Sequence, residues 1–134
     1  MDEVKKAPPR APKGLSKSAQ LWWRKVVPRL IELDVIDVSA DYGRLVLLAQ
    51  AWGMAQDAYK TLIREGILRK DDRGITRKHP AHQIWRDSSA AYNSLGKELG
   101  ITPLSRKRLG VRDDEGLDEL AAFLIRPRRR KNGQ

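Results

Sequence analysis

The chain has 134 residues, enough for one domain, and combines 40% hydrophobic residues with a formal net charge of +10. It contains no cysteine, which excludes both a disulfide framework and a zinc site with thiolate ligands. No apolar run approaches the roughly 20 residues that a membrane span requires. The opening residues, MDEVKKAPPR, lack the apolar region of a signal peptide. We therefore expect a soluble protein that is not exported.

The positive charge is concentrated outside the central part of the chain. Residues 18–68 and 80–96 each carry equal numbers of basic and acidic side chains. The excess lies in the N-terminal arm, at 69–79, at 97–112 and in the tail at 126–131. Basic segments around a neutral body are typical of proteins that bind polyanions, most often nucleic acids. Basic tails that only aid solubility or bind an acidic protein are the alternative.

The first 14 residues contain three prolines and scattered charge, which predicts a disordered or extended basic arm. Ser16 is a suitable N-cap, and apolar residues at steps of three and four predict a first helix from Lys17 to Leu33. Pro28 lies inside this helix, so we expect a kink or a short break there.

The longest amphipathic segment runs from Ser39, the predicted N-cap, to Gly66, the predicted stop. One apolar stripe consists of Leu45, Leu48, Trp52, Ala55, Tyr59 and Leu62. The opposite side is partly apolar and rich in small residues, namely Val46, Ala51, Met54 and Ala58. One side can therefore pack within the chain and the other against a second subunit. Alternatively, both sides belong to the core.

Two short runs flank Asp71-Asp72-Arg73-Gly74, whose residue types favour a turn and predict a small β-hairpin with basic edges. Pro80 can start the next helix, from Ala81 to Leu99, which ends at Gly100. Its predicted inner side consists of Ile84, Ser88, Ala91, Tyr92, Leu95 and Leu99. Further short helices are predicted from Leu104 to Leu109 and from Leu117 to Ile125.

These elements predict a mainly α protein, with one long central helix, a short β-hairpin and flexible basic termini. We divide the chain into a disordered basic arm (1–14), a helical core for DNA binding and oligomerisation (15–110), an acidic segment with a short helix (111–125) and a basic flexible tail (126–134).

Enzyme signatures are absent from the sequence, and we expect no catalytic residue, metal or cofactor. There is no phosphate-binding loop, no Gly-x-Ser-x-Gly motif and no cysteine nucleophile. His79 and His82 are spaced so that both can lie on one side of a turn, but no further metal ligand is near them in sequence. We favour a capping or phosphate-contacting role for them. The acidic run Asp113 to Glu119 fits the first turn of a helix better than a nuclease site.

Ten basic residues are our candidates for DNA binding. Arg106, Lys107 and Arg108 follow a predicted helix start, where exposed amides also favour anions. The candidates are Lys5, Lys6, Arg10, Lys13 and Lys17 in the arm, Arg24 and Lys25 on the first helix, and Arg106, Lys107 and Arg108. The tail at 128–131 would add salt-sensitive contacts with little sequence specificity.

The large apolar residues are spaced for helix packing rather than for base stacking. We assign roles in the core or in subunit contacts to Trp22, Trp23, Leu48, Trp52 and Tyr59.

The order of these segments resembles phage terminase small subunits, specifically the family typical of long-tailed cos phages. The stretch LWWRKVVPRL at 21–30 resembles their opening helix. The segments that follow also come in the same order as in that family. They are a long helix opened by Asp41, the stop at Gly66, a polar hairpin and a helix opened by Pro80. The ending LGITPLSR at 99–106 is the most specific element. The resemblance covers about residues 8–110, and the segment after Gly110 matches nothing that we can place.

The resemblance implies a non-catalytic packaging component that acts in the host cytoplasm. Such subunits are similar in forming rings of mostly helical protomers, in binding double-stranded viral DNA near the packaging start and in modulating the ATPase and nuclease of the terminase large subunit. A ring requires two different contact surfaces on each subunit, which a two-faced central helix can supply. Two other function classes remain open: a dimeric DNA-binding regulator of the helix-turn-helix type, and a structural connector protein of a phage particle.

Overall fold

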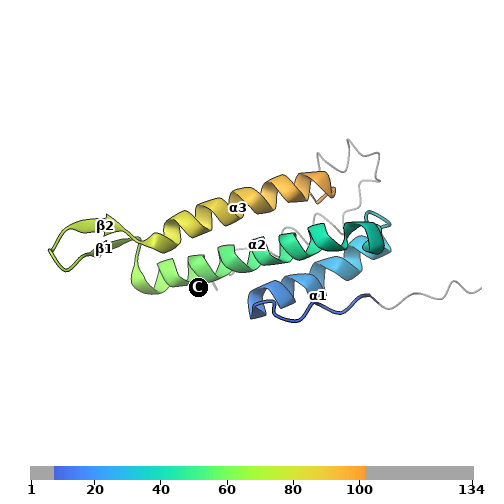
Figure 1. Ribbon diagram of the computed structural model, residues 1–134, viewed down its shortest axis with the longest axis horizontal. Coiled ribbons are helices and arrows are strands. Elements are labelled where there is room, and N and C mark those ends of the chain that lie inside the picture. Colours follow the sequence, from blue (N-terminus) through green and yellow to red (C-terminus); the bar gives the residue numbers. More distant parts are fainter. Residues whose placement is uncertain (1–7, 102–134) are drawn as a thin grey trace, which may run out of the picture.

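A computed structural model describes residues 8–101 (Figure 1). Within this range the chain forms α1 (Lys17–Glu32), α2 (Val38–Glu65), β1 (Leu68–Lys70), β2 (Thr76–Lys78) and α3 (Pro80–Glu98). The prediction of a mainly helical fold with one long helix and a short hairpin is confirmed. None of these helices is long and apolar enough to cross a membrane. The helices predicted at 104–109 and 117–125 lie outside the described residues.

Helix α1 begins and continues as its sequence predicts, except at its proline. The Ser16 hydroxyl accepts a hydrogen bond from the Ala19 amide at 3.2 Å, which confirms Ser16 as the N-cap. The helix runs through Pro28 to Glu32, so the break that we considered there is absent. Val27 and Leu30 on either side of Pro28 are fully buried, and their packing holds this turn in the helix.

Helix α2 begins two residues earlier than predicted, because Asp37 rather than Ser39 is its N-cap. The Asp37 carboxylate accepts from the Ser39 amide at 2.9 Å, and the Asp41 carboxylate accepts from the Asp37 amide at 2.9 Å. These paired acceptors satisfy amides that the helix itself leaves free. The prediction for the other end is confirmed: Gly66 ends α2 with a φ of 84°.

The core lies where all three helices meet. Seven large side chains are fully buried there: Trp22, Trp23, Val26, Val27 and Leu30 from α1, and Leu45 and Leu48 from α2. Helix α3 joins this core through Tyr92, whose hydroxyl accepts a hydrogen bond from Nε1 of Trp22 at 3.0 Å. The Tyr92 ring also lies 5.3 Å from the ring of Trp52, centroid to centroid. Burial raises the pKa of the Tyr92 phenol.

Helix α1 covers only part of α2, whereas α3 runs beside α2 over most of its length (Figure 1). The start of α1 meets the middle of α2 at Gly53, where an added Cβ would lie 2.7 Å from Oγ of Ser16. Beyond Gly53, α2 and α3 continue as a two-helix arm that ends in the hairpin. We call this part, α2 from Met54 and α3 up to Ser88, the helical arm.

The predicted inner side of α3 is correct only in part. Ser88 and Leu99 are buried, and Tyr92 and Leu95 pack against the core. Ile84 and Ala91 are exposed, so their assignment to the inner side was wrong. Both lie at one edge of the stripe, and α2 alone is too narrow to cover that edge. Gly100 adopts a φ of 76° just after the helix, as expected for its stop.

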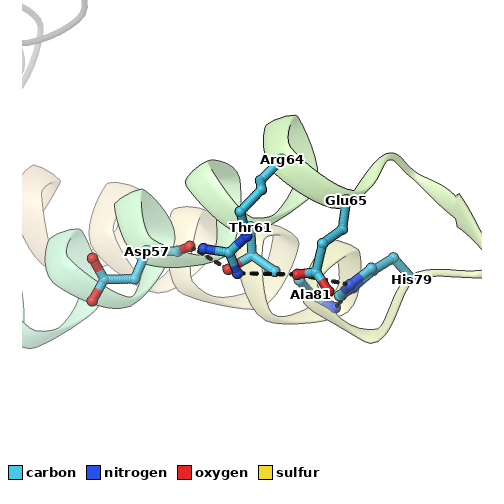
Figure 2. Close-up of polar contacts among 6 residues, drawn as sticks. All are labelled: Asp57, Thr61, Arg64, Glu65, His79 and Ala81. Atoms are coloured by element: carbon cyan, nitrogen blue, oxygen red, sulfur yellow. Dashed lines mark hydrogen bonds and ion pairs between the residues drawn. The ribbon is translucent and has the colours of Figure 1, made fainter.

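A short junction fixes the hairpin to the two helices (Figure 2). The Ile67 carbonyl accepts from the His79 amide at 2.6 Å. Nδ1 of His79 accepts from the Ala81 amide at 3.0 Å and so caps α3. Figure 2 shows the His79 ring between Ala81 and Glu65, with 3.6 Å from its Nε2 to Oε2 of Glu65. Arg64, which contacts Glu65 at 3.2 Å, is the main reason that the pKa of Glu65 is lowered.

Candidate nucleic-acid interface

Five of the ten predicted DNA-binding residues lie in the described part of the chain. Arg10, Lys13, Lys17 and Arg24 are exposed, and Lys25 is half-buried. The remaining five, Lys5, Lys6, Arg106, Lys107 and Arg108, lie outside the described residues.

Residues 8–14 carry no helix or strand, but they lie against α1. The Trp23 indole donates a hydrogen bond from Nε1 to the Pro9 carbonyl at 2.9 Å, and Ala11 packs on the core. This contact brings Arg10 beside Arg24, because both side chains line one surface hollow of about 380 Å³. The N-terminal arm and α1 thus form one basic surface around Arg10 and Arg24, which we call the arm surface. It is not part of the helical arm formed by α2 and α3.

Arg24 and Lys25 are neighbours in sequence but lie on different sides of α1. Lys25 lines a second hollow of about 220 Å³, together with Trp52 and Lys60 of α2. The structure therefore divides the predicted cluster and adds Lys60, which sequence reasoning missed. The spacing of residues along one helix could not predict that Lys60 lies near Lys25, because the two residues lie on different helices.

A polar contact fixes the start of α1 beside this second hollow. The Ser18 hydroxyl donates to Oδ1 of Asp57 at 2.8 Å, and Nζ of Lys60 lies 3.5 Å from Oγ of Ser18. Ser18 is buried, so the contact joins α1 to α2 at the point where the helical arm begins.

The β-hairpin carries a further group of exposed basic side chains, namely Arg69, Lys70, Arg73, Arg77 and Lys78. The two strands pair in antiparallel register, with Leu68 opposite Lys78 and Arg69 opposite Arg77. Arg77 donates from Nε to Oδ2 of Asp71 at 2.9 Å. The sequence placed these residues at the edges of a hairpin without assigning them to DNA binding.

The residues predicted for core or subunit contacts occupy three different environments. Trp22, Trp23 and Leu48 are fully buried within the protomer. Trp52 is partly buried and packs on the core, whereas Tyr59 is 50% exposed. Among these five residues, Tyr59 is therefore the one with a side chain largely free for a second subunit.

The small residues on the other side of α2 are also accounted for within the chain. Ala51 and Ala58 are buried, and Ala58 packs with Leu62 and Ala81 at the contact with α3. The idea that this side is left for another subunit is therefore wrong for the two alanines. Met54, at 55% exposure, remains open to solvent.

Among residues 8–101, the helical arm exposes apolar side chains that no third helix covers. Tyr59 and Ile63 of α2, at 50% and 69% exposure, are joined by Met54 and by Ile84 and Trp85 of α3. Large apolar residues exposed together on one element mark an interaction site more often than a solvated surface.

His79 and His82 have different surroundings in the described part of the chain. No group of three or more His, Cys, Asp or Glu residues within 8–101 could hold a metal ion. His79 caps α3, which agrees with the capping role that we favoured, and the His82 ring lies 6.2 Å from the ring of Trp85.

A family model described as phage terminase, small subunit, matches residues 19–116, which is most of the chain. Searches of curated proteins and of solved structures found no match.

Proposed function

Because the chain belongs to the phage terminase small subunit family, we propose that it recognises viral double-stranded DNA when genome packaging begins. The observation that carries this proposal is the arm surface, where the exposed residues Arg10 and Arg24 line one hollow beside α1. Within residues 8–101 neither guanidinium group has an acidic partner, and two such groups beside one another are suited to phosphate oxygens.

In this proposal the protein is not an enzyme and acts in the host cytoplasm. Its family is generally non-catalytic. The terminase large subunit is its protein partner, and the small subunit hands DNA to it and regulates its ATPase and nuclease. The division of labour fits a chain whose sequence lacks a phosphate-binding loop.

We further propose that the protein assembles into a homo-oligomeric ring. The support is the uncovered apolar surface of the helical arm around Tyr59, Ile63 and Trp85. A ring needs two different contact surfaces on each protomer. In the helical arm, α2 can supply one of these surfaces and α3 the other. Such assembly would also bring many arm surfaces together on one DNA molecule, which raises the overall affinity.

The salt dependence of DNA binding tests the role of the arm surface. The double variant Arg10→Gln/Arg24→Gln should bind a DNA duplex with a log–log salt slope smaller by about 1.8, if each arginine neutralises one phosphate. With affinity at 1 M salt unchanged, the same loss corresponds to roughly 60-fold weaker binding at 0.1 M salt. Fluorescence anisotropy on a labelled duplex at several salt concentrations measures both quantities.

The matched control is Arg86→Gln/Lys97→Gln, which removes the same charge from exposed positions on α3. It should change the slope much less. Equal slopes for wild type, variant and control would contradict the assignment of the arm surface to DNA.

A further inference from the structure

We propose that the β-hairpin between α2 and α3 is a second contact surface for double-stranded DNA, separate from the arm surface. The inference rests on the proposed DNA-binding function and assigns to it an element outside our ten sequence candidates. It is carried by three observations: the charge of the hairpin, its exposure and its fixed attachment to the helices.

The hairpin has more positive charge than its own fold requires. Residues 68–78 contain five basic and two acidic side chains. One of the acids, Asp71, is used internally: its carboxylate accepts from the amides of Arg73 and Ile75 and from Arg77. Within residues 8–101, the side chains of Arg69, Lys70, Arg73 and Lys78 have no hydrogen bond or ion pair.

The pairing of the strands also sets like charges against each other. Arg69 lies directly opposite Arg77, an arrangement that destabilises an antiparallel pair. Lys70 and Lys78 share the other face with Leu68, which is 62% exposed. An isolated two-stranded hairpin is only marginally stable in water. The repulsion between these cations and the exposure of Leu68 do not help the hairpin to fold. They fit a surface that binds an anionic partner.

The hairpin is nevertheless held in place. The Asp71 carboxylate and Gly74, with a φ of 78°, fix its tip, and the Ile67 carbonyl accepts from the His79 amide at its base. His79 and Glu65 then connect this base to both helices (Figure 2). The cations are thereby presented on a fixed support, so that less conformational entropy is lost on binding.

The shape of the hairpin favours duplex DNA over other polyanions. All residues of both strands are exposed, so neither face of the ribbon is covered by the helices. A two-stranded ribbon fits the major groove of B-form DNA, with basic side chains near the phosphates on either rim. The hairpin projects beyond the ends of α2 and α3 (Figure 1). Its base lies roughly 18 Å along α2 from Gly53, where the start of α1 meets that helix. One protomer can thus contact DNA at two separated places.

The test uses the double variant Lys70→Gln/Lys78→Gln in the full chain. Both lysines lie on one face of the ribbon and have no structural partner among the described residues. We expect a salt slope smaller by about 1.8 and roughly 60-fold weaker binding of a duplex at 0.1 M salt. Lys70→Arg/Lys78→Arg should keep the wild-type slope, because it retains both charges. Arg86→Gln/Lys97→Gln again serves as the charge-matched control.

Circular dichroism and thermal melting establish that each variant keeps the wild-type fold, and Arg69→Gln/Arg73→Gln offers a second pair on the same hairpin. If wild type and the arm-surface variant differ in slope while both hairpin pairs behave as the control does, the hairpin inference is wrong and the proposed function stands. If wild type itself shows no salt-dependent binding, both are wrong. Weakened capture of the large subunit with unchanged DNA binding would assign the hairpin to a protein partner and overturn the inference.

Discussion

At the scale of single residues, the hairpin turn depends on one carboxylate. Asp71 accepts hydrogen bonds at 2.9 Å from the amides of Arg73 and Ile75 and from Nε of Arg77. These contacts, the Ile75 amide first and Arg77 second, lower the pKa of Asp71 below its ordinary value of 3.8. A carboxylate with a lowered pKa in the folded state stabilises that state while it is ionised.

The pH dependence of the hairpin follows from this shift. The stabilisation by Asp71 is fully present above pH 3.8 and is lost as the pH falls through the lower pKa of the folded state. We expect the amide of Ile75 to lose its protection from hydrogen exchange over this range, and Asp71→Asn to lose part of it already at neutral pH. NMR on both proteins measures this protection. Asp72→Asn is the control, since the Asp72 side chain makes no contact of this kind within residues 8–101. Equal protection in Asp71→Asn and wild type would contradict this role.

Residue-scale features were predictable where a local rule applies. Ser16, Gly66 and Pro80 have the predicted roles because caps and stops depend on neighbouring residues. Ser39 failed as an N-cap because the Asp37 carboxylate, two residues earlier, accepts from the Ser39 amide and starts the helix there. The bond from Trp23 to the Pro9 carbonyl could not be predicted, because it joins an irregular segment to a helix face through tertiary packing alone.

At the scale of elements, the contact between α1 and α2 depends on Gly53. A Cβ at this position would meet Oγ of Ser16 at 2.7 Å and Cβ of Ala19 at 2.9 Å, closer than real contacts allow. Ser16 is also the N-cap of α1, so its movement would disturb the start of that helix. The close approach explains why a glycine is placed inside α2 despite its low helix propensity.

The substitution Gly53→Ala should therefore destabilise the protein, by about 1–3 kcal/mol as for an overpacked core. Gly43→Ala, in the same helix but with open space around its Cβ, should instead raise stability by up to about 1 kcal/mol through helix propensity. Urea unfolding of both variants measures the two free energies. Equal effects of the same sign would show that α1 does not approach α2 at Gly53.

At the scale of elements, the sequence predicted the ends of the helices to within two residues, but not which other elements pack against them. The three-and-four spacing located all three described helices, and the Asp-Asp-Arg-Gly turn located the hairpin. The spacing could not show that the start of α1 meets α2 at Gly53, so that within residues 8–101 no third helix packs on the helical arm. It therefore assigned Ile84 and Ala91 to a buried side, and it could not divide Arg24 from Lys25 or pair Lys25 with Lys60.

At the scale of the whole molecule, the described part of the protomer has basic side chains on the arm surface and on the hairpin. The helical arm between core and hairpin exposes apolar side chains. In our proposal these features belong together, because a packaging component must hold DNA and contact protein partners. In our proposal the apolar arm joins protomers, while the arm surface and the hairpin face DNA. Neither the ring nor its number of subunits follows from the sequence, because exposed side chains such as Tyr59 become interface residues only through the second copy.

The central claim is that several chains act together on one DNA molecule. Light scattering coupled to size exclusion tests it directly, first on protein treated with nuclease and stripped of DNA at high salt, then with one duplex added. We predict a single species several times the 15.3 kDa chain mass, which gains the mass of one duplex at low salt. Tyr59→Glu/Ile63→Glu, at two exposed positions of the helical arm, should reduce the assembly to folded protomers. A wild-type monomer or dimer would contradict the ring and favour a dimeric DNA-binding regulator, and an assembly that gains no DNA mass would contradict the proposed function.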